Sequence, residues 1–189
     1  MRTQLRLVTP PTERAVDLST ARRHMRVEDI DSDDLIAMYI EAAEQSLAYV
    51  GRALKPASYA LDIYGHPHWR FELPMPPLRS VTAVRTVGAD GNLSVYDPAN
   101  YVVTTSAEGR GTIRLASTSG TWPYYAVNYV TASVEFTAGY DVVPSALRSA
   151  ILLIAGSLYD NRASVGPLNL YRVPDAVDSL VAPYMDPAA

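Results

Sequence analysis

The chain has 189 residues, of which 48% are hydrophobic and 19% are charged, and its formal net charge is −4. This composition excludes intrinsic disorder and argues against a sequence-specific nucleic-acid reader, which needs a basic face. The length fits one domain, or one domain with an insertion, and allows a substantial core. There is no cysteine, so neither a disulfide framework nor a thiolate zinc site can form. Residues 1–8 lack the apolar core of a signal peptide, and no apolar run approaches membrane-spanning length, so we expect a protein made and kept in a cytoplasm.

The first third of the chain predicts an extended arm followed by two helices. Residues 1–16 form the arm, which ends at Pro10-Pro11, and Asp17 is a candidate N-cap for a helix that reaches about Val27. A second helix starts among the acidic residues 31–34, which complement the helix dipole, and ends near Gly51. Its apolar residues recur at helical spacing on one face: Ile36, Ile40, Ala43, Leu47 and Val50.

The middle of the chain changes to a period of two. A strip at residues 71–81 contains three prolines in four positions, so we expect it to be extended and unable to pair inside a sheet. Asp90-Gly91 is a turn signal between two strands. The candidate strands are residues 59–64, 81–87, 93–96, 101–105, 112–115 and 129–136.

Helical spacing returns after Gly139. Pro144 fits the first position of a helix whose apolar residues are Leu147, Ile151, Ile154 and Leu158, and residues 159–162 close it. A loop around Gly166-Pro167 leads to a last short helix that starts at Pro174. The predicted fold is therefore α+β: a helical core from both ends of the chain with an inserted antiparallel β region. We expect one domain, made of the N-terminal arm and helices (1–56), the β insertion (57–138) and the C-terminal helices and tail (139–189).

No constellation of residues predicts an active site, a cofactor site or a metal site. His66-Pro67-His68 is the only tight pair of potential metal ligands, and His24 lies in another predicted helix, so a polar turn explains the pair better. The arginines at positions 22, 23 and 26 are best explained as a solvated helix face. The 13 tyrosines, against two phenylalanines and two tryptophans, favour surfaces that become interfaces.

An ordered set of motifs spans residues 5–185. It comprises Leu7-Val8-Thr9-Pro10-Pro11, Asp17-Leu18, Arg26, the strip Leu73-Pro74-Met75-Pro76-Pro77-Leu78-Arg79-Ser80-Val81, Asp90-Gly91, Trp122-Pro123, Thr137-Ala138-Gly139-Tyr140 with Pro144, and Tyr159-Asp160-Asn161-Arg162. This order resembles the head–tail connector (adaptor) proteins of long-tailed phages and of phage-derived gene transfer agents. Residues 163–173 depart from the pattern.

The resemblance implies a non-enzymatic structural protein that is made in a bacterial cytoplasm and resides at the head–tail junction of a virion or gene-transfer-agent particle. Its implied partners are itself, in a twelve-subunit ring, then the portal protein, a stopper or tail protein, and DNA that passes through the channel without sequence-specific binding. We expect the ring contacts to involve the β region and the helix near residues 33–51. The tail (163–189), with the arm before Pro10 as a second candidate, is expected to meet the portal. The candidate interface residues are Tyr39, Tyr49, Tyr59, Tyr64, Val177, Leu180, Val181 and Tyr184.

Two other classes of protein remain open from the residues alone. One is a small enzyme whose site is assembled from scattered residues such as His24, Asp62 and His68, which a deep pocket with perturbed pKa values would favour. The other is a monomeric module that binds a peptide along an exposed sheet edge.

Overall fold

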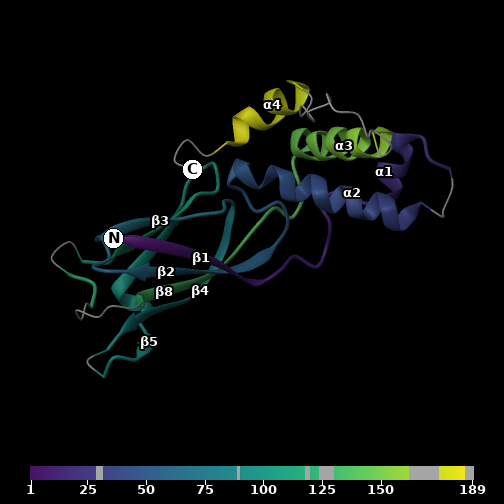
Figure 1. Ribbon diagram of the computed structural model, residues 1–189. Helices are drawn as coiled ribbons and strands as arrows, with labels where there is room; N and C mark the ends of the chain where they lie inside the picture. The colour runs from purple at the N-terminus through teal and green to yellow at the C-terminus, as the bar shows by residue number, and fades with distance from the viewer. Residues whose placement is uncertain (29–31, 89, 118–119, 124–129, 162–174, 186–189) are drawn as a thin grey trace. The chain divides into compact units, whose positions relative to one another are not determined.

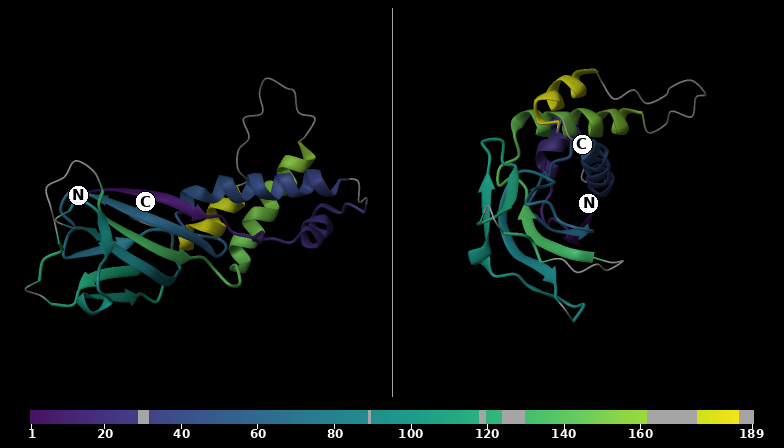
Figure 2. Two further views of the ribbon diagram at one scale, coloured as in Figure 1. Left: turned by 90° about the horizontal axis from the view of Figure 1, so that it is seen from below. Right: turned by 90° about the vertical axis from the view of Figure 1, so that its left-hand side faces the viewer.

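The computed structural model describes residues 1–28, 32–88, 90–117, 120–123, 130–161 and 175–185. The chain divides into two compact units, one made of residues 1–12 and 56–140 and the other of residues 13–55 and 141–189. Figures 1 and 2 show that strands gather in the first unit and helices in the second. The predicted α+β class, with helices from both ends of the chain and an antiparallel β region between them, is confirmed.

The strands of the first unit form two antiparallel sheets. A five-stranded sheet has the order β1-β2-β8-β4-β5, and a three-stranded sheet has the order β3-β7-β6. The strands are β1 (Arg2–Thr9), β2 (Ala57–Tyr64), β3 (Arg70–Leu73), β4 (Leu78–Val87), β5 (Leu93–Val95), β6 (Tyr101–Thr105), β7 (Gly111–Leu115) and β8 (Val130–Ala138), and a 3₁₀ turn (Pro98–Asn100) precedes β6.

The core of this unit lies on one face of the five-stranded sheet. Leu61, Val134 and Val84 are aligned across β2, β8 and β4, and all three are buried. The Trp122 ring contacts Phe71 of β3 and Tyr96, which follows β5, with ring centroids 5.7 and 5.4 Å apart. These contacts join the two sheets around an apolar and aromatic interior.

The second unit contains α1 (Leu18–Met25), α2 (Asp33–Ser46), α3 (Ser145–Asp160) and α4 (Asp175–Val181), with 3₁₀ turns at Leu47–Val50 and Ala182–Tyr184. The five apolar residues predicted to share one face of the second helix are all buried. Gly51 ends the helical segment in a left-handed conformation (φ 71°), which a residue without a side chain adopts most easily. The Asp17 side chain caps α1, as predicted, because its carboxylate accepts a hydrogen bond from the Thr20 backbone N–H.

The proline strip departs from its prediction. Residues 71–73 belong to β3 and residues 78–81 belong to β4, so only residues 74–77 lie outside strands. The prolines occupy the connection between two strands of different sheets, where their missing donors interrupt no ladder.

Residues 2–9 are paired in the sheet as β1, so the sheet extends beyond the predicted insertion at 57–138. Pro144 occupies the N-cap of α3, one position before the one predicted, because its ψ of 141° is extended. Five residues used in the sequence predictions lie outside the described part of the chain: Tyr129, Arg162, Gly166, Pro167 and Pro174.

Candidate assembly surface

Strand β1 forms one edge of the five-stranded sheet. It pairs with β2, with Leu5 opposite Leu61 and Leu7 opposite Tyr59, and Figure 1 shows it beside β2. Among the described residues, no strand pairs with its other side. All eight residues of β1 are exposed, and Leu7 retains 56% of its accessible surface. The strand therefore presents free backbone groups together with apolar side chains.

A buried carboxylate holds β1 to the sheet. Arg6 donates to Asp62 of β2, with 2.6 Å between Nε and Oδ2, and the Ser133 hydroxyl of β8 donates to Asp62 Oδ1 at 2.7 Å. Burial raises the pKa of Asp62, but the bonds from Arg6 and Ser133 outweigh that effect and leave the pKa below its ordinary value. Asp62 is therefore a structural anion that links three neighbouring strands.

The other arginine of β1 is also held over the sheet. The Arg2 guanidinium lies 5.6 Å from the centroid of the Tyr64 ring, and the Tyr64 hydroxyl donates to Gln4 Oε1 at 3.1 Å. Tyr64, one of the predicted interface residues, therefore contacts β1 of its own chain. Both arginines of β1 therefore contact side chains of β2.

Strand β5 forms the opposite edge of the same sheet. Its residues pair with β4, with Val95 opposite Arg85 and Ser94 opposite Thr86. Leu93 and Val95 are exposed, and Val95 retains 64% of its accessible surface. Within the described residues, β5 has a sheet partner on one side only. The sheet thus ends in two different edges, both with exposed apolar side chains.

The remaining predicted tyrosines occupy different environments. Tyr59 is buried and stacks on Phe136, and burial raises the pKa of its hydroxyl. Tyr39 meets Tyr159 of α3 edge to face, with centroids 6.3 Å apart. Tyr49 is 46% exposed, and partial burial followed by the charge of Asp178 raises the pKa of its hydroxyl. Helix α2 and the 3₁₀ turn that follows it form one helical segment, residues 33–50, here called the α2 segment. Tyr49 and Met38, which is also exposed, lie on the side of this segment opposite its buried stripe.

The predicted C-terminal residues pack within the helical unit. Val177 and Val181 are fully buried, whereas Leu180 and Tyr184 are half-buried. Arg52 Nε donates to the Tyr184 carbonyl at 2.6 Å, and its guanidinium lies 5.8 Å from the Tyr184 ring centroid. The chain's own helical unit therefore already covers part of the short apolar face of α4.

The residues of the possible scattered site are divided between the two units. His24 belongs to the helical unit, whereas Asp62 and His68 belong to the strand unit. Asp62 is committed to Arg6 and Ser133, and the His68 carbonyl accepts a hydrogen bond from Trp122 Nε1 at 2.7 Å. No group of three or more His, Asp or Glu in the described residues is arranged to hold a metal ion.

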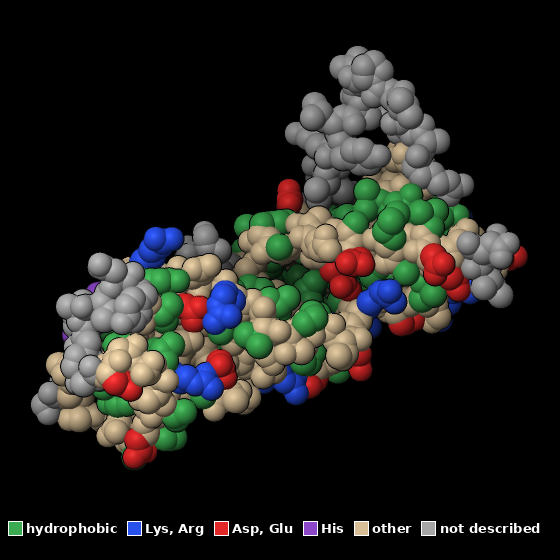
Figure 3. Space-filling view, turned by 60° about the horizontal axis from the view of Figure 1, so that its bottom comes forward, with side chains coloured by type: hydrophobic (Ala, Val, Ile, Leu, Met, Phe, Trp, Pro, Cys, Tyr) green, Lys and Arg blue, Asp and Glu red, His purple; other side chains and the backbone are tan. Residues whose placement is uncertain are grey.

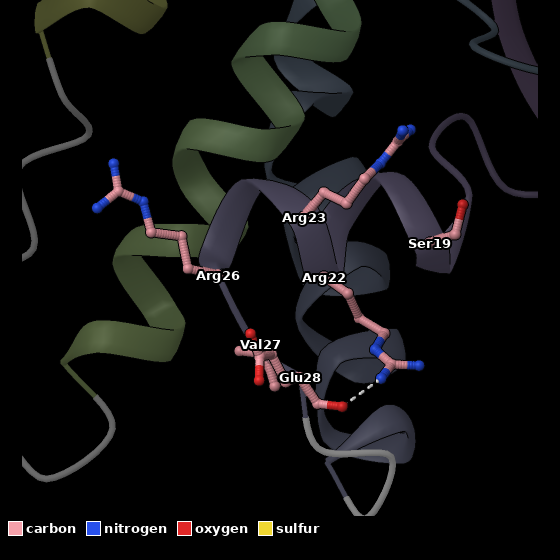
Figure 4. A pocket seen from close by; sticks show the side chains of 6 residues that line it. All are labelled: Ser19, Arg22, Arg23, Arg26, Val27 and Glu28. Atoms are coloured by element: carbon pink, nitrogen blue, oxygen red, sulfur yellow. Dashed lines mark hydrogen bonds between the residues drawn. The ribbon is translucent and has the colours of Figure 1, made fainter.

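A shallow hollow beside α1 is lined by Ser19, Arg22, Arg23, Arg26, Val27 and Glu28. Figure 4 shows the three arginine side chains pointing in different directions, and Arg22 donates to the Glu28 carbonyl at 2.8 Å. Arg22 Nε also lies 3.5 Å from Asp33 Oδ1. The arginines do not converge on one point, so the hollow has no geometry for a single small anion.

Charges of both signs are mixed with hydrophobic side chains on the face shown in Figure 3, and no large field of one sign appears there. No helix in the described part of the chain is long and apolar enough to cross a membrane. The features that stand out are therefore surfaces suited to protein contacts: two sheet edges and the outer side of the α2 segment.

Sequence reasoning predicted the strand at 93–96 that became β5, but it did not predict β1 as a strand or place either strand at a sheet edge. The signal for β1 was present, because Thr3, Leu5 and Leu7 alternate with Arg2, Gln4 and Arg6 at the period of a strand. The Arg6–Asp62 pair had no local signal, since 56 residues separate its members in the sequence.

Comparisons with solved structures find the same fold over nearly the whole chain. A chain in the neck of an empty gene transfer agent particle, computed with C6 symmetry, matches with a TM-score of 0.76 and 22% identity, covering 96% of this chain and 95% of that one. A chain in the virion of a native gene transfer agent particle matches with a TM-score of 0.73 and 22% identity, covering 96% and 94%. A chain in the neck of the native particle, computed with C12 symmetry, gives 0.73 and 21%, with the same coverage.

No model of a protein family matches the chain, and no curated protein matches it. The likeness to the neck and virion chains is one of fold. At that level, the resemblance to head–tail connector proteins found in the sequence is confirmed.

Proposed function

We propose that this protein is a structural, non-enzymatic component of the head–tail junction of a phage or gene-transfer-agent particle. The observation that carries the proposal is the shared fold across 96% of the chain with chains of gene-transfer-agent necks and virions. A match of this extent includes both the strand unit and the helical unit, rather than one common substructure.

Within that role, the protein forms a ring of twelve copies below the portal, where it extends the DNA channel and joins the capsid to a stopper or tail protein. Neck structures computed with C6 and C12 symmetry support a cyclic arrangement. A cyclic ring requires two different surfaces on each subunit, because each copy contacts one neighbour on either side. The net charge of −4 suits a channel wall along which DNA moves without being held, since phosphate binding grows with each Lys or Arg contact.

The outer side of the α2 segment is proposed as part of the contact between subunits. Tyr49 and Met38 are the exposed large residues there, and aromatic residues and methionine are enriched at interface cores. Tyr39, Tyr59 and Tyr64 contribute indirectly, because they pack against residues of their own chain.

The C-terminal tail, residues 163–189, is proposed as the contact with the portal. The helix α4 has seven residues, and a helix this short gains order mainly by packing. Among the described residues, the portal contact can involve Leu180, Tyr184 and the exposed Met185. Such a contact leaves Val177 and Val181 buried within the helical unit.

The test is cryo-electron microscopy of particles from cells that make the protein with an epitope tag after residue 189. We expect antibody density at the head–tail junction and tailless heads when the gene is deleted. Normal tailed particles after deletion, or label elsewhere, would overturn the proposal. A Leu180→Asp variant, with Val142→Asp as an exposed control, tests the portal contact through occupancy on filled heads.

A second candidate function is a monomeric module that binds an extended peptide along the free edge of β1. The outer side of that eight-residue strand, which pairs with no other described strand, favours it. This candidate would be supported over the ring if each neck held a single copy of the protein and that copy bound a partner peptide through β1.

A further inference from the structure

Within the described residues, the five-stranded sheet ends in two edges that no further strand covers. Isolated proteins blunt exposed edges with lysine, proline or bulges that turn the edge away. Strand β1 contains no lysine or proline, and its two arginines are held over the sheet by Asp62 and Tyr64. Its register with β2 shifts only between Leu7 and Thr9, so residues 2–7 form a regular ladder. Strand β5 consists of Leu93, Ser94 and Val95; it carries no charge, and its short length is its one protection of this kind. Both edges are therefore open to another strand.

The two edges are different from each other and lie at opposite ends of one sheet. An edge that paired with its own copy would give a closed two-fold dimer, whereas two different edges that pair with each other continue from copy to copy. Each of the four junctions in the sheet is antiparallel, so β1 and β5 run in the same direction. Copies related by a small rotation about a ring axis keep that direction, so the new junction would be parallel.

We propose that the outer edge of β5 in one copy pairs with the outer edge of β1 in the next copy, so that the sheet continues from subunit to subunit around the ring. This inference rests on the proposed ring function and names the surface that builds it. Pairing satisfies the free backbone groups of both strands and removes apolar side chains such as Leu7 and Val95 from water.

The register within the sheet makes the proposal specific to one face. One row of cross-strand partners runs through Ser94, Thr86, Ala132, Ile63 and Thr3. Thr3, Leu5 and Leu7 therefore share a face with Ser94, whereas Gln4 points to the opposite face. If β5 and β1 pair as strands, Ser94 must therefore come close to residues on the Thr3 face and not to Gln4. Two surfaces that only lie near each other need not show this alternation.

The test is disulfide formation in necks purified from particles that carry the full chain. The chain has no cysteine, so engineered pairs give no background. Thr3→Cys, Leu5→Cys and Leu7→Cys are each combined with Ser94→Cys, which samples the register. We expect a ladder of covalent multimers for at least one of these pairs after mild oxidation. Gln4→Cys with Ser94→Cys, and the single variants, should give no ladder.

The outcomes separate this inference from the proposed function. If the protein is present in the necks and none of the three pairs gives a ladder, β1 and β5 are not the contact. Dimers from Leu5→Cys alone would show β1–β1 pairing, and a bond between Leu5→Cys and a different protein would make that protein the occupant; either result overturns the inference. If the protein is absent from the necks, the proposed function itself fails.

Discussion

Arg6 and Asp62 form an ion pair across the first two strands of the sheet, with 2.6 Å between Nε and Oδ2. The Asp62 side chain is only 8% exposed, whereas that of Arg6 is 54% exposed. The pair therefore joins a buried carboxylate to an arginine at the protein surface. Because Ser133 of β8 donates to the same carboxylate, one side chain holds three strands together.

Replacing Asp62 with alanine should lower the free energy of unfolding by roughly 2–3 kcal/mol, because hydrogen bonds to charged groups are lost and the Ser133 hydroxyl is left without its partner. Urea denaturation measures the change. Asp160→Asn, at an exposed aspartate, should shift stability by less than about 0.5 kcal/mol. Equal effects of the two substitutions would contradict the role assigned to Asp62.

The cap of α1 should make stability fall in acid. Hydrogen bonds from Ser19 and Thr20 lower the pKa of Asp17 to about 2. A carboxyl whose pKa is depressed in the folded state stabilises the fold above its unfolded pKa of about 4, and this contribution disappears as the pH falls toward about 2. Asp17→Ala should cost about 1 kcal/mol at neutral pH, and Asp17→Asn less.

Thermal unfolding between pH 7 and pH 2 checks this prediction. The difference in stability between the unmodified protein and Asp17→Asn should narrow as the pH falls below about 4, since the asparagine cap does not titrate. A difference that stays constant across this range would show that the Asp17 charge contributes nothing.

Gly109 should tolerate alanine less well than Gly65 does. Both have a positive φ, 81° and 80°, so alanine brings similar backbone strain at each. A Cβ at Gly109 would lie 2.5 Å from Pro77 Cβ, whereas one at Gly65 would have no atom within 4 Å. Gly109→Ala should therefore unfold at a denaturant concentration well below that of Gly65→Ala, by an added cost of about 1–3 kcal/mol. Matching midpoints would refute the close contact with Pro77.

The tyrosines should separate into residues that stabilise the subunit and residues that assemble it. Tyr59→Ala removes a buried ring stacked on Phe136 and should cost about 3–5 kcal/mol of unfolding free energy. Tyr49→Ala removes an exposed ring, so it should change stability by less than about 1 kcal/mol while reducing incorporation into necks. Denaturation of the purified protein and quantification of the protein in necks measure the two effects. Normal incorporation of Tyr49→Ala would remove the outer side of the α2 segment from the proposed subunit contact.

The local elements could be predicted from the sequence because their signals lie within short windows. The apolar spacing from Ile36 to Val50 predicts the α2 segment, and Gly51 marks its end. Asp90-Gly91 predicts the β4–β5 hairpin, in which the Gly88 N–H donates to the Asn92 carbonyl. The α+β class followed from the change of period along the chain.

Only the tertiary structure decided which segments became partners. Residues 2–9 are predicted as an extended arm, and they become a strand because β2, which lies far along the chain, has backbone groups that pair with them. The Asp62 carboxylate of β2 also binds Arg6. In the same way, residues 71–73 of the proline strip pair with β7 as part of β3, and residues 78–81 pair with β8 as part of β4. Strand pairing joins residues that are distant in the chain, so local preference sets which residues can extend, and the fold determines which edges are filled and which remain open.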